Sequence, residues 1–431
     1  MTMQRMRYGA AASSVAGSIG GTISSPPSEP LELRARKAAG VELPVSDAVC
    51  RSRTRTLSAP TAVGSPDVAI LLDHFGSGGV ERVACHVANG LQQRGLRVEM
   101  VVLRDTGPIR TLLDPAVRVR ELRAAPLLNR GARLLTAVPA LAHYLREHTP
   151  GLLHSPGNHT HVAAWLAVVL AGYRGAFVPK ITNPLRKHGG TGLGQWLRRA
   201  FYGRAFGRAQ RVLVLSSTGM DGIAEFDAGL PPRTHFVRNP YVSAEMLRLS
   251  AARVPADLPV ILCVGRLSRQ KNQALLLRAA ARLRHRDWRL RFCGTGPDES
   301  ALRDLANELG LAERVEFAGF VADLAPEYLR ATVTALPSRW EDLPATILEA
   351  IACGCPVVAT ASSPALIELL REVGAREPVA VGDEAGLASA IEDALDHRLP
   401  AIPSSASLPY AIDAACEEHA KIFAGLLSEA R

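Results

Sequence analysis

The sequence lacks an apolar run long enough to cross a bilayer. Its longest run, Val162–Ala171, is far shorter than the roughly 20 residues that a spanning helix needs, so we expect a buried helix there. Residues 1–65 also lack the continuous apolar core of a signal peptide. They are rich in Ser, Ala, Pro and Arg without a sustained apolar period, which predicts a disordered tail. Four acidic residues in this tail disfavour the alternative of a transit peptide.

Aromatic residues and paired cysteines are scarce as well. Aromatics make up 5% of the chain, so Ala, Leu and Val must build most of its interior. The seven cysteines are scattered without a Cys-x-x-Cys pair, and Cys353 and Cys355 are separated by one residue, which is not a zinc-site spacing. We therefore expect reduced thiols in a cytoplasmic protein and no metal site.

Lysine is rare although the chain is basic. Only five of its 50 basic residues are lysines, and the formal net charge is +9. An arginine excess of this kind can reflect genomic base composition alone. Its physical consequence is still a preference for anionic partners such as nucleotides, phospholipid surfaces or nucleic acid.

Two similar series of short apolar runs alternate with helical patterns, and this predicts parallel sheets covered by helices. The 431 residues, 47% of them hydrophobic, suffice for two packed cores. The first series predicts strands at Val68–Phe75, Arg97–Arg104, Leu152–Pro156, Val178–Asn183 and Arg211–Ser216, with helices at Val80–Arg94 and Ala132–Glu147. The second predicts strands at Val260–Arg266, Leu290–Gly294, Val315–Gly319, Val333–Pro337 and Pro356–Thr360, with helices at Gln273–Arg284, Glu299–Leu309 and Ala345–Cys353. The expected fold class is α/β with two Rossmann-like, doubly wound domains at 66–245 and 246–405, a tail at 1–65 and a C-terminal helix within 406–431 that packs back across the domains.

The most informative motif runs from Pro337 to Thr360. A strand ends, a turn carries Glu341, a helix carries Glu349, and the chain returns through Gly354-Cys355-Pro356 to a strand. Ligands of open α/β sheets bind outside the carboxyl ends of the strands, where this turn is expected. The alternative is a pair of solvated glutamates near a helix start, favoured by the helix dipole.

Two cations follow the first strand of the second series. Arg266 and Lys271 lie five residues apart in one loop, so both can converge on one anion. Fixed cations in a water-excluded site stabilise a developing negative charge far better than they would in water. Ordinary surface charge after a strand is the alternative.

Glycine-rich turns follow several strands. Gly76-Ser77-Gly78-Gly79 follows the first strand, where glycines let the backbone approach a ligand and the helix N-terminus favours anions. Gly294-Thr295-Gly296 and Gly319-Phe320 follow later strands. Each of the first two segments is also compatible with a plain tight turn.

Together these motifs resemble retaining GT-B glycosyltransferases of glycosyltransferase family 4, the glycosyl transferases group 1 type. The resemblance rests on the E-x7-E pattern of Glu341 and Glu349 and on the following EA-x-A-x-G-x-P-V-V-A-T segment, and it covers both series. Relatives usually carry Gly after the first Glu, whereas this chain has Asp342. The resemblance implies two Rossmann-like domains facing each other across a cleft.

The resemblance also implies roles for individual residues. Glu341 would contact donor-sugar hydroxyls, Glu349 the nucleotide ribose, and Arg266 with Lys271 the donor diphosphate. The other residues implied on the donor side are Gly265, Gly294, Gly296, Phe320, Asp342, Leu343 and Pro344. Because no Asp-x-Asp occurs, we expect these cations to act in place of a metal ion.

The first series is expected to hold the acceptor or the transferred sugar. Gly78 and Gly79 resemble the corresponding glycine-rich loop of the family. Many relatives have a histidine where this chain has Thr182-Asn183-Pro184, so the sugar-contacting residue stays open. The candidates, besides the two glycines, are Asn158, Asn183, His154 and His159, and a lone histidine is more often structural.

A stretch at Trp196–Arg211 mixes arginines with aromatic residues at helix-compatible spacing. It predicts either contact with an anionic membrane or a core-packed helix with a solvated basic face. The sequence predicts no recognised nucleic-acid-binding module.

The function expected overall is metal-independent transfer of a sugar from a donor such as a UDP- or GDP-sugar to a glycan or lipid-linked acceptor, with retention of configuration. The alternatives are a nucleotide-sugar epimerase and a non-catalytic nucleotide-sugar-binding protein.

Overall fold

The computed structural model describes most of the chain beyond the N-terminal tail. The described residues are 64–122, 130–182, 192–216, 219–220, 223 and 231–429. Nearly all of the predicted tail and the candidate Asn183 lie outside the described residues. Among the helices that are described, none is both long and apolar enough to cross a membrane.

The first sheet is parallel and has the strand order β3-β2-β1-β4-β5. Its central strands are buried on both faces, as expected of parallel strands rich in branched apolar residues. Ile70 in β1 pairs with Met100 on one side and His154 on the other. The strands are β1 Val68–Leu72, β2 Val98–Val102, β3 Arg118–Glu121, β4 Leu152–Ser155 and β5 Ala176–Pro179.

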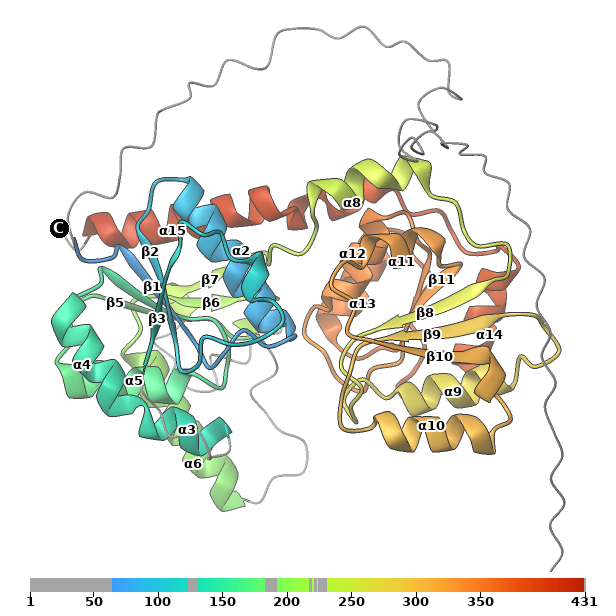
Figure 1. The fold of residues 1–431 in the computed structure, drawn as a ribbon, viewed down its shortest axis with the longest axis horizontal. Helices are drawn as coiled ribbons and strands as arrows, with labels where there is room; N and C mark the ends of the chain where they lie inside the picture. The colour runs from blue at the N-terminus through green and yellow to red at the C-terminus, as the bar shows by residue number, and fades with distance from the viewer. Residues whose placement is uncertain are drawn as a thin grey trace, which may run out of the picture. The chain divides into compact units, whose positions relative to one another are not determined.

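Helices cover both faces of this sheet. One core cluster joins it to the helices of one face and a second cluster joins it to α2 and α15 (Figure 1). The predicted helix at Ala132–Glu147 is divided into α3 and α4, with Pro139 in the first turn of α4. The helices are α2 Gly79–Gln93, α3 Arg130–Thr136, α4 Val138–His148, α5 His161–Ala171 and α6 Gly192–Gly207, with a 3-10 turn at Arg110–Leu112.

The strand β6 and the helix α5 of the first half also differ from the sequence prediction. The strand expected at Arg211–Ser216 is β6 Val212–Val214, which pairs with the unpredicted β7 Thr234–Phe236 and is joined to the end of β5 by an isolated Lys180–Leu213 bridge. The helix expected to be buried at Val162–Ala171 is α5, and its Val169 and Leu170 are 57% and 50% exposed. Apolar character alone therefore overstated its burial.

The second sheet repeats the topology of the first, with the parallel order β10-β9-β8-β11-β12. In Figure 1, α9, α10 and α14 lie on one side of it and α11, α12 and α13 on the other, and a separate core cluster fills each side. The strands are β8 Val260–Val264, β9 Arg289–Cys293, β10 Val315–Gly319, β11 Val333–Leu336 and β12 Val357–Ala359. The helices are α9 Gln273–Ala281, α10 Glu299–Glu308, α11 Ala325–Arg330, α12 Ala345–Ala352, α13 Pro364–Glu372 and α14 Glu384–Leu395.

The C-terminal helix α15, Ile412–Glu429, packs on the first half of the chain. Phe423 is fully buried in the core that contains β1 and α2, and Arg94 of α2 pairs with Asp413 at 2.6 Å. α8 Ala244–Leu249 and the 3-10 turn at Ser250–Ala252 lead from the first half to the second, and the 3-10 turn at Ser404–Tyr410 precedes α15. Further 3-10 turns at Pro231–Arg233 and Ala312–Arg314 lie before β7 and β10. The domain limits predicted from the sequence stay predictions.

Each sheet has one point where the strand order reverses. In the second sheet this point lies between β8 and β11, so the loops that follow these two strands diverge from neighbouring positions at the same edge. Ligands of open α/β sheets bind at such a point. The loops concerned are 265–272 and 337–344, which carry the predicted cations and the first glutamate of E-x7-E.

Candidate functional site

Backbone and side-chain hydrogen bonds join the two loops at the strand-order reversal of the second sheet. Arg339 N donates to Gln270 O at 2.8 Å, and the Gln270 side chain donates to Trp340 O at 2.9 Å. Asn272, which adopts the left-handed conformation, donates to Pro337 O at 3.3 Å. The two loops therefore form one connected surface.

Lys271 and Glu341 meet directly within this surface. Lys271 Nζ lies 2.7 Å from Glu341 Oε1, and Ser338 Oγ donates to the same oxygen at 2.7 Å. The Glu341 side chain is 8% exposed and the Lys271 side chain 20% exposed, so both are held yet retain some access to solvent. A cation and an anion preoriented in this way can bind a ligand that carries both phosphate and hydroxyl groups.

Glu349 lies on α12 and is almost completely buried. Tyr328 donates a hydrogen bond to its Oε2 at 2.8 Å. Burial raises the pKa of Glu349, while the nearby Arg82 and the Tyr328 hydrogen bond lower it. Arg82 belongs to α2, so a group from the first half of the chain acts on the second glutamate of E-x7-E.

Asp342 is the residue at which this chain departs from the usual glycine. Its Oδ1 accepts a hydrogen bond from Ser216 Oγ at 2.7 Å, and its carbonyl accepts one from Ser363. Burial raises the pKa of Asp342, and the Ser216 hydrogen bond opposes this rise. The carboxylate is thus engaged by a serine that directly follows the first half's β6 region.

Three of the predicted glycines, Gly265, Gly294 and Gly296, allow the loop after β8 to lie directly against the loop after β9. Gly265 and Gly294 have φ of +141° and +151°, in the region that favours glycine. A Cβ built on Gly294 would lie 2.1 Å from Gly265 O, and one on Gly296 would lie 2.0 Å from Leu267 O. The Gly-x-Gly turn therefore supports the loop that carries Arg266 and Lys271.

The glycine-rich loop after β1 reaches Arg266. A Cβ built on Gly78 would lie 3.8 Å from Arg266 Nη2, whereas one on Gly79 would meet nothing within 4 Å. Arg266 is exposed, and its guanidinium lies near Gly78 and outside the ion pair of Lys271 with Glu341. The structure thus brings Lys271 and Glu341 into contact and places Arg266 beside the glycine loop instead.

The remaining first-half candidates have structural contacts. Asn158 Oδ1 accepts from Thr182 N at 3.0 Å, and its carbonyl accepts from Tyr202 at 2.7 Å. His154 is 1% exposed and packs on Phe423, so we leave it out of the proposed site. His159 lies in the loop after β4, beside Gly157.

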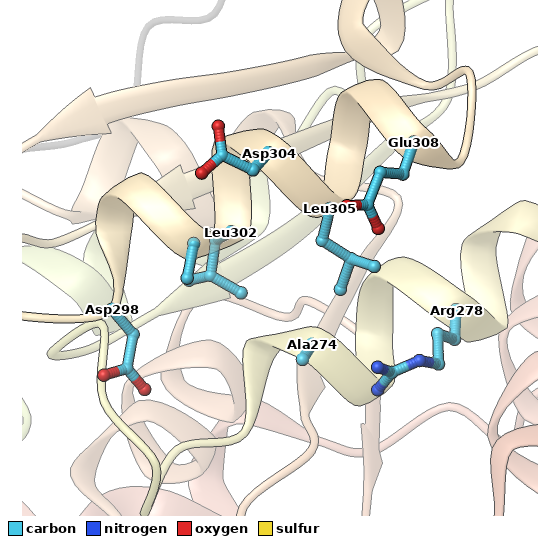
Figure 2. Close-up of a pocket in the computed structure, with 8 residues that line it drawn as sticks. Ala274, Arg278, Asp298, Leu302, Asp304, Leu305 and Glu308 are labelled. Carbon is cyan, nitrogen blue, oxygen red and sulfur yellow. The ribbon is translucent and has the colours of Figure 1, made fainter.

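The last donor-side candidates lie around the E-x7-E turn and at the end of β10. Leu343 and Pro344 are buried, and Pro344 caps α12. Phe320, just after β10, is 37% exposed. A surface groove between α9 and α10 contains none of the predicted site residues and is lined by apolar side chains, three acids and Arg278 (Figure 2). The described residues contain no group of three or more side chains arranged to hold a metal ion.

Sequence reasoning missed Ser216, Ser338 and Tyr328 as partners of the acids. Ser216 and Ser338 could have been found, because each is a polar residue two positions after the end of a buried apolar strand. Tyr328 could not, because its pairing with Glu349 joins two helices, α11 and α12, whose packing the sequence does not reveal.

Two family models together match most of the described chain. One, described as "Glycosyl transferases group 1", matches residues 258–397. The other, described as "Glycosyl transferase 4-like domain", matches residues 78–240. The second of these matches runs from the loop after β1 through β7, and the first covers the second sheet from β8 through α14.

Curated relatives align over both halves. The lipopolysaccharide core biosynthesis glycosyltransferase LpsE of Rhizobium meliloti is 30% identical over 328 residues, which are 74% of this chain and 86% of that protein. The D-inositol 3-phosphate glycosyltransferase 1 of Catenulispora acidiphila is 31% identical over 325 residues, 66% of this chain and 75% of that protein.

Solved structures share the fold at lower identity. WaaG, described as a glycosyltransferase involved in lipopolysaccharide biosynthesis, superposes with a TM-score of 0.65 at 18% identity, covering 83% of this chain and 100% of WaaG. Anabaena HepE in complex with UDP and glucose superposes with a TM-score of 0.63 at 19% identity, covering 84% of this chain and 98% of HepE.

Proposed function

The chain belongs to the glycosyl transferases group 1 family and is a glycosyltransferase with the GT-B fold, and from this premise we propose that it takes its sugar from a nucleotide-sugar donor. The observation that carries the proposal is the 2.7 Å contact between Lys271 and Glu341 at the strand-order reversal. It pairs a cation suited to a diphosphate with a carboxylate suited to sugar hydroxyls. HepE, which shares the fold, was crystallised with UDP-glucose and with UDP and glucose.

In the proposed reaction the acceptor oxygen bonds to the anomeric carbon while the bond from that carbon to the donor phosphate breaks. Negative charge grows on the leaving nucleoside diphosphate, where Lys271 and Arg266 stabilise it without a metal ion. We propose that the acceptor proton passes to the departing phosphate oxygen, so that attack on the same face retains configuration. Glu341 would hold the sugar hydroxyls and Glu349 the ribose.

We further propose a glycan or lipid-linked acceptor in the cell envelope, held beside the glycine loop of the first half and Asn158. LpsE and WaaG are both described as acting in lipopolysaccharide biosynthesis. The exposed Trp196 and Phe201 of α6, with Arg199 and Arg204 of that helix, supply a surface for anionic lipid at the cytoplasmic face of a membrane.

The donor is identified by thermal unfolding in the presence of UDP- and GDP-sugars, because a ligand that binds only the folded state stabilises it. With the donor found, Glu341→Gln, Lys271→Met and Arg266→Ala should each lower the rate of transfer by about 100-fold or more. Lys421→Met and Glu308→Gln, which change surface charges on α15 and α10, are the matched controls and should keep wild-type rates.

The products separate the proposal from its alternatives. Near-normal turnover in all three site variants would overturn the site assignment. An epimerised free donor would identify an epimerase, and donor binding without transfer or hydrolysis would identify a binding protein.

A further inference from the structure

Two buried side chains, Lys180 and Asn239, and the partly buried Tyr241 link the first sheet to the E-x7-E turn. Lys180, directly after β5, donates from Nζ to Asn239 Oδ1 at 2.9 Å. Asn239 Nδ2 donates to Tyr241 Oη at 2.7 Å, and Tyr241 Oη donates to Leu343 O at 3.2 Å. Lys180 is 1% exposed and Asn239 4% exposed, so most of this path is shielded from water.

The three hydrogen bonds point in one direction. Burial raises the pKa of Tyr241, the hydrogen bond from Asn239 opposes this rise, and the carboxylates of Asp342, Glu349 and Glu341 add to it. The hydroxyl therefore stays protonated and can donate a hydrogen bond. Each donor in the series is polarised by the bond before it, which strengthens the last bond, the one to Leu343 O.

Among the residues that the structure describes, no carboxylate pairs with Lys180, which sets it apart from most buried cations. Its side chain donates a hydrogen bond to the neutral amide of Asn239, and burial lowers its pKa from 10.5 to about 7. A methionine would fill a similar volume without the cost of burying an ammonium group. Stability alone therefore does not account for a lysine at this position.

The receiving end of the series is a carbonyl with a specific structural role. Leu343 lies two residues after Glu341, and the next residue, Pro344, caps α12. Because the peptide group is planar, a fixed Leu343 carbonyl fixes the orientation of the Leu343–Pro344 peptide and thus the start of α12. The position of Glu341 and the direction of the first N–H groups of α12 depend on it.

Backbone hydrogen bonds hold the segment around Tyr241, which lies between β7 and α8. Tyr241 N and Val242 N both donate to Tyr410 O, at 3.1 and 3.0 Å, and Ile412 N donates back to Val242 O at 2.9 Å. The backbone at Tyr241 is therefore held in place, and its side-chain hydroxyl is directed at Leu343 O.

We propose that Lys180, acting through Asn239 and Tyr241, is a positioning residue for the turn that carries Glu341. The inference deepens the proposed function. Of the two experiments that test it, the donor titration rests on that function and the hydrogen-exchange measurement does not.

Hydrogen exchange measured by mass spectrometry tests the positioning without any ligand. In Tyr241→Phe and in Lys180→Met, amides of the peptide covering residues 340–352 should exchange about three- to tenfold faster, the effect of one lost hydrogen bond. The matched control is Tyr173→Phe, which removes a buried hydroxyl that donates to Pro150 O at 2.7 Å far along the sequence from the turn. It should leave the 340–352 peptide at the wild-type rate.

The ligand-binding arm uses titration with UDP-glucose and GDP-mannose. Tyr241→Phe and Lys180→Met should weaken binding of the donor that the wild type accepts by about three- to tenfold, and the double variant should lose little more, because the residues act in one series. Unchanged exchange in both single variants, or an equal rise in Tyr173→Phe, would overturn the inference. If neither the wild type nor the variants bind UDP-glucose or GDP-mannose, faster exchange in the variants than in the wild type would still support the positioning. The lack of binding would then count against the proposed donor class.

Discussion

Ser216 and Asp342 form a hydrogen bond of 2.7 Å that depends on the one residue where the E-x7-E turn departs from the usual pattern. Ser216→Ala should lower the free energy of unfolding by about 1–3 kcal/mol, because a buried carboxylate loses a donor. Urea unfolding at pH 7 measures this. Ser428→Ala, at an exposed serine of α15, is the control. A Ser216→Ala variant as stable as the wild type would show that Asp342 finds another donor.

Glu349 gives a prediction about pH. Burial raises its pKa, so protonation of this carboxylate begins at a higher pH than for an exposed glutamate. If Glu349 accepts hydrogen bonds from the ribose, donor affinity should fall as the pH is lowered toward that raised pKa. Isothermal titration between pH 5 and pH 8 measures this, and Glu349→Gln should bind weakly with no such pH dependence. The same pH dependence in Glu349→Gln would assign it to another group.

The sequence identified the two loops of the site but not the pairing of side chains within them. Glycines such as Gly265 and Gly294 could be predicted as turn positions, because a positive φ leaves few alternatives to glycine. The contact of Lys271 with Glu341 joins residues 70 positions apart, and only the folded sheet brings them together. The burial of His154 depends on Phe423 from α15, which no local pattern reveals.

At the scale of elements, α15 completes the core of the first half. Leu426→Ala, at 4% exposure, should lower the free energy of unfolding by about 2–5 kcal/mol, because the core cannot close the cavity. Leu408→Ala is the matched control, since Leu408 is 49% exposed and loses little buried area. Urea unfolding of both variants measures the difference. Equal losses would mean that α15 does not contribute to that core.

The elements that the sequence predicted well are those with buried central strands, such as β1 and β8. The missed ones are short or amphipathic. β3 has the sequence RVRE with three exposed side chains and lies at the sheet edge, so it has no apolar run to detect. α5 was placed correctly but its burial was overstated, because its C-terminal valine and leucine face solvent.

At the scale of the whole molecule, both sheets have the same strand order, and the loops that carry Gly78, Lys271 and Glu341 follow strands at the order reversals, whereas Gly294 and Phe320 follow β9 and β10. The family assignment and the GT-B fold predicted from the sequence are confirmed by the two family models and the shared folds. The donor, the stereochemistry and the site roles stay predictions, because they depend on bound ligands.

The buried basic groups predict how stability of the folded chain changes with pH. Burial lowers the pKa of His161 and His419 from 6.5 to about 3, and burial together with Lys180 lowers that of His154 well below its usual value. Between pH 3 and pH 6.5 the unfolded chain therefore binds more protons at these histidines than the folded chain does. The free energy of unfolding should fall as the pH is lowered through this range.

Lys180 extends the same trend above neutrality. Its pKa is about 7 in the folded chain and 10.5 as the ordinary value, so between these limits the unfolded chain holds the extra proton and stability should rise with pH. The rise is up to about 1.4 kcal/mol per pH unit from this one group. Above pH 9 the trend reverses in part, because burial raises the pKa of thiols such as Cys85 and Cys263 to about 12.

Urea unfolding from pH 7 to pH 8.5 therefore measures the contribution of Lys180 to the pH dependence of stability. The slope should disappear in Lys180→Met and persist in Lys421→Met, whose lysine is 74% exposed. If the free energy of unfolding of Lys180→Met still rises with pH, another group causes the rise. Lys180 would then titrate near its ordinary pKa, with water reaching its ammonium group.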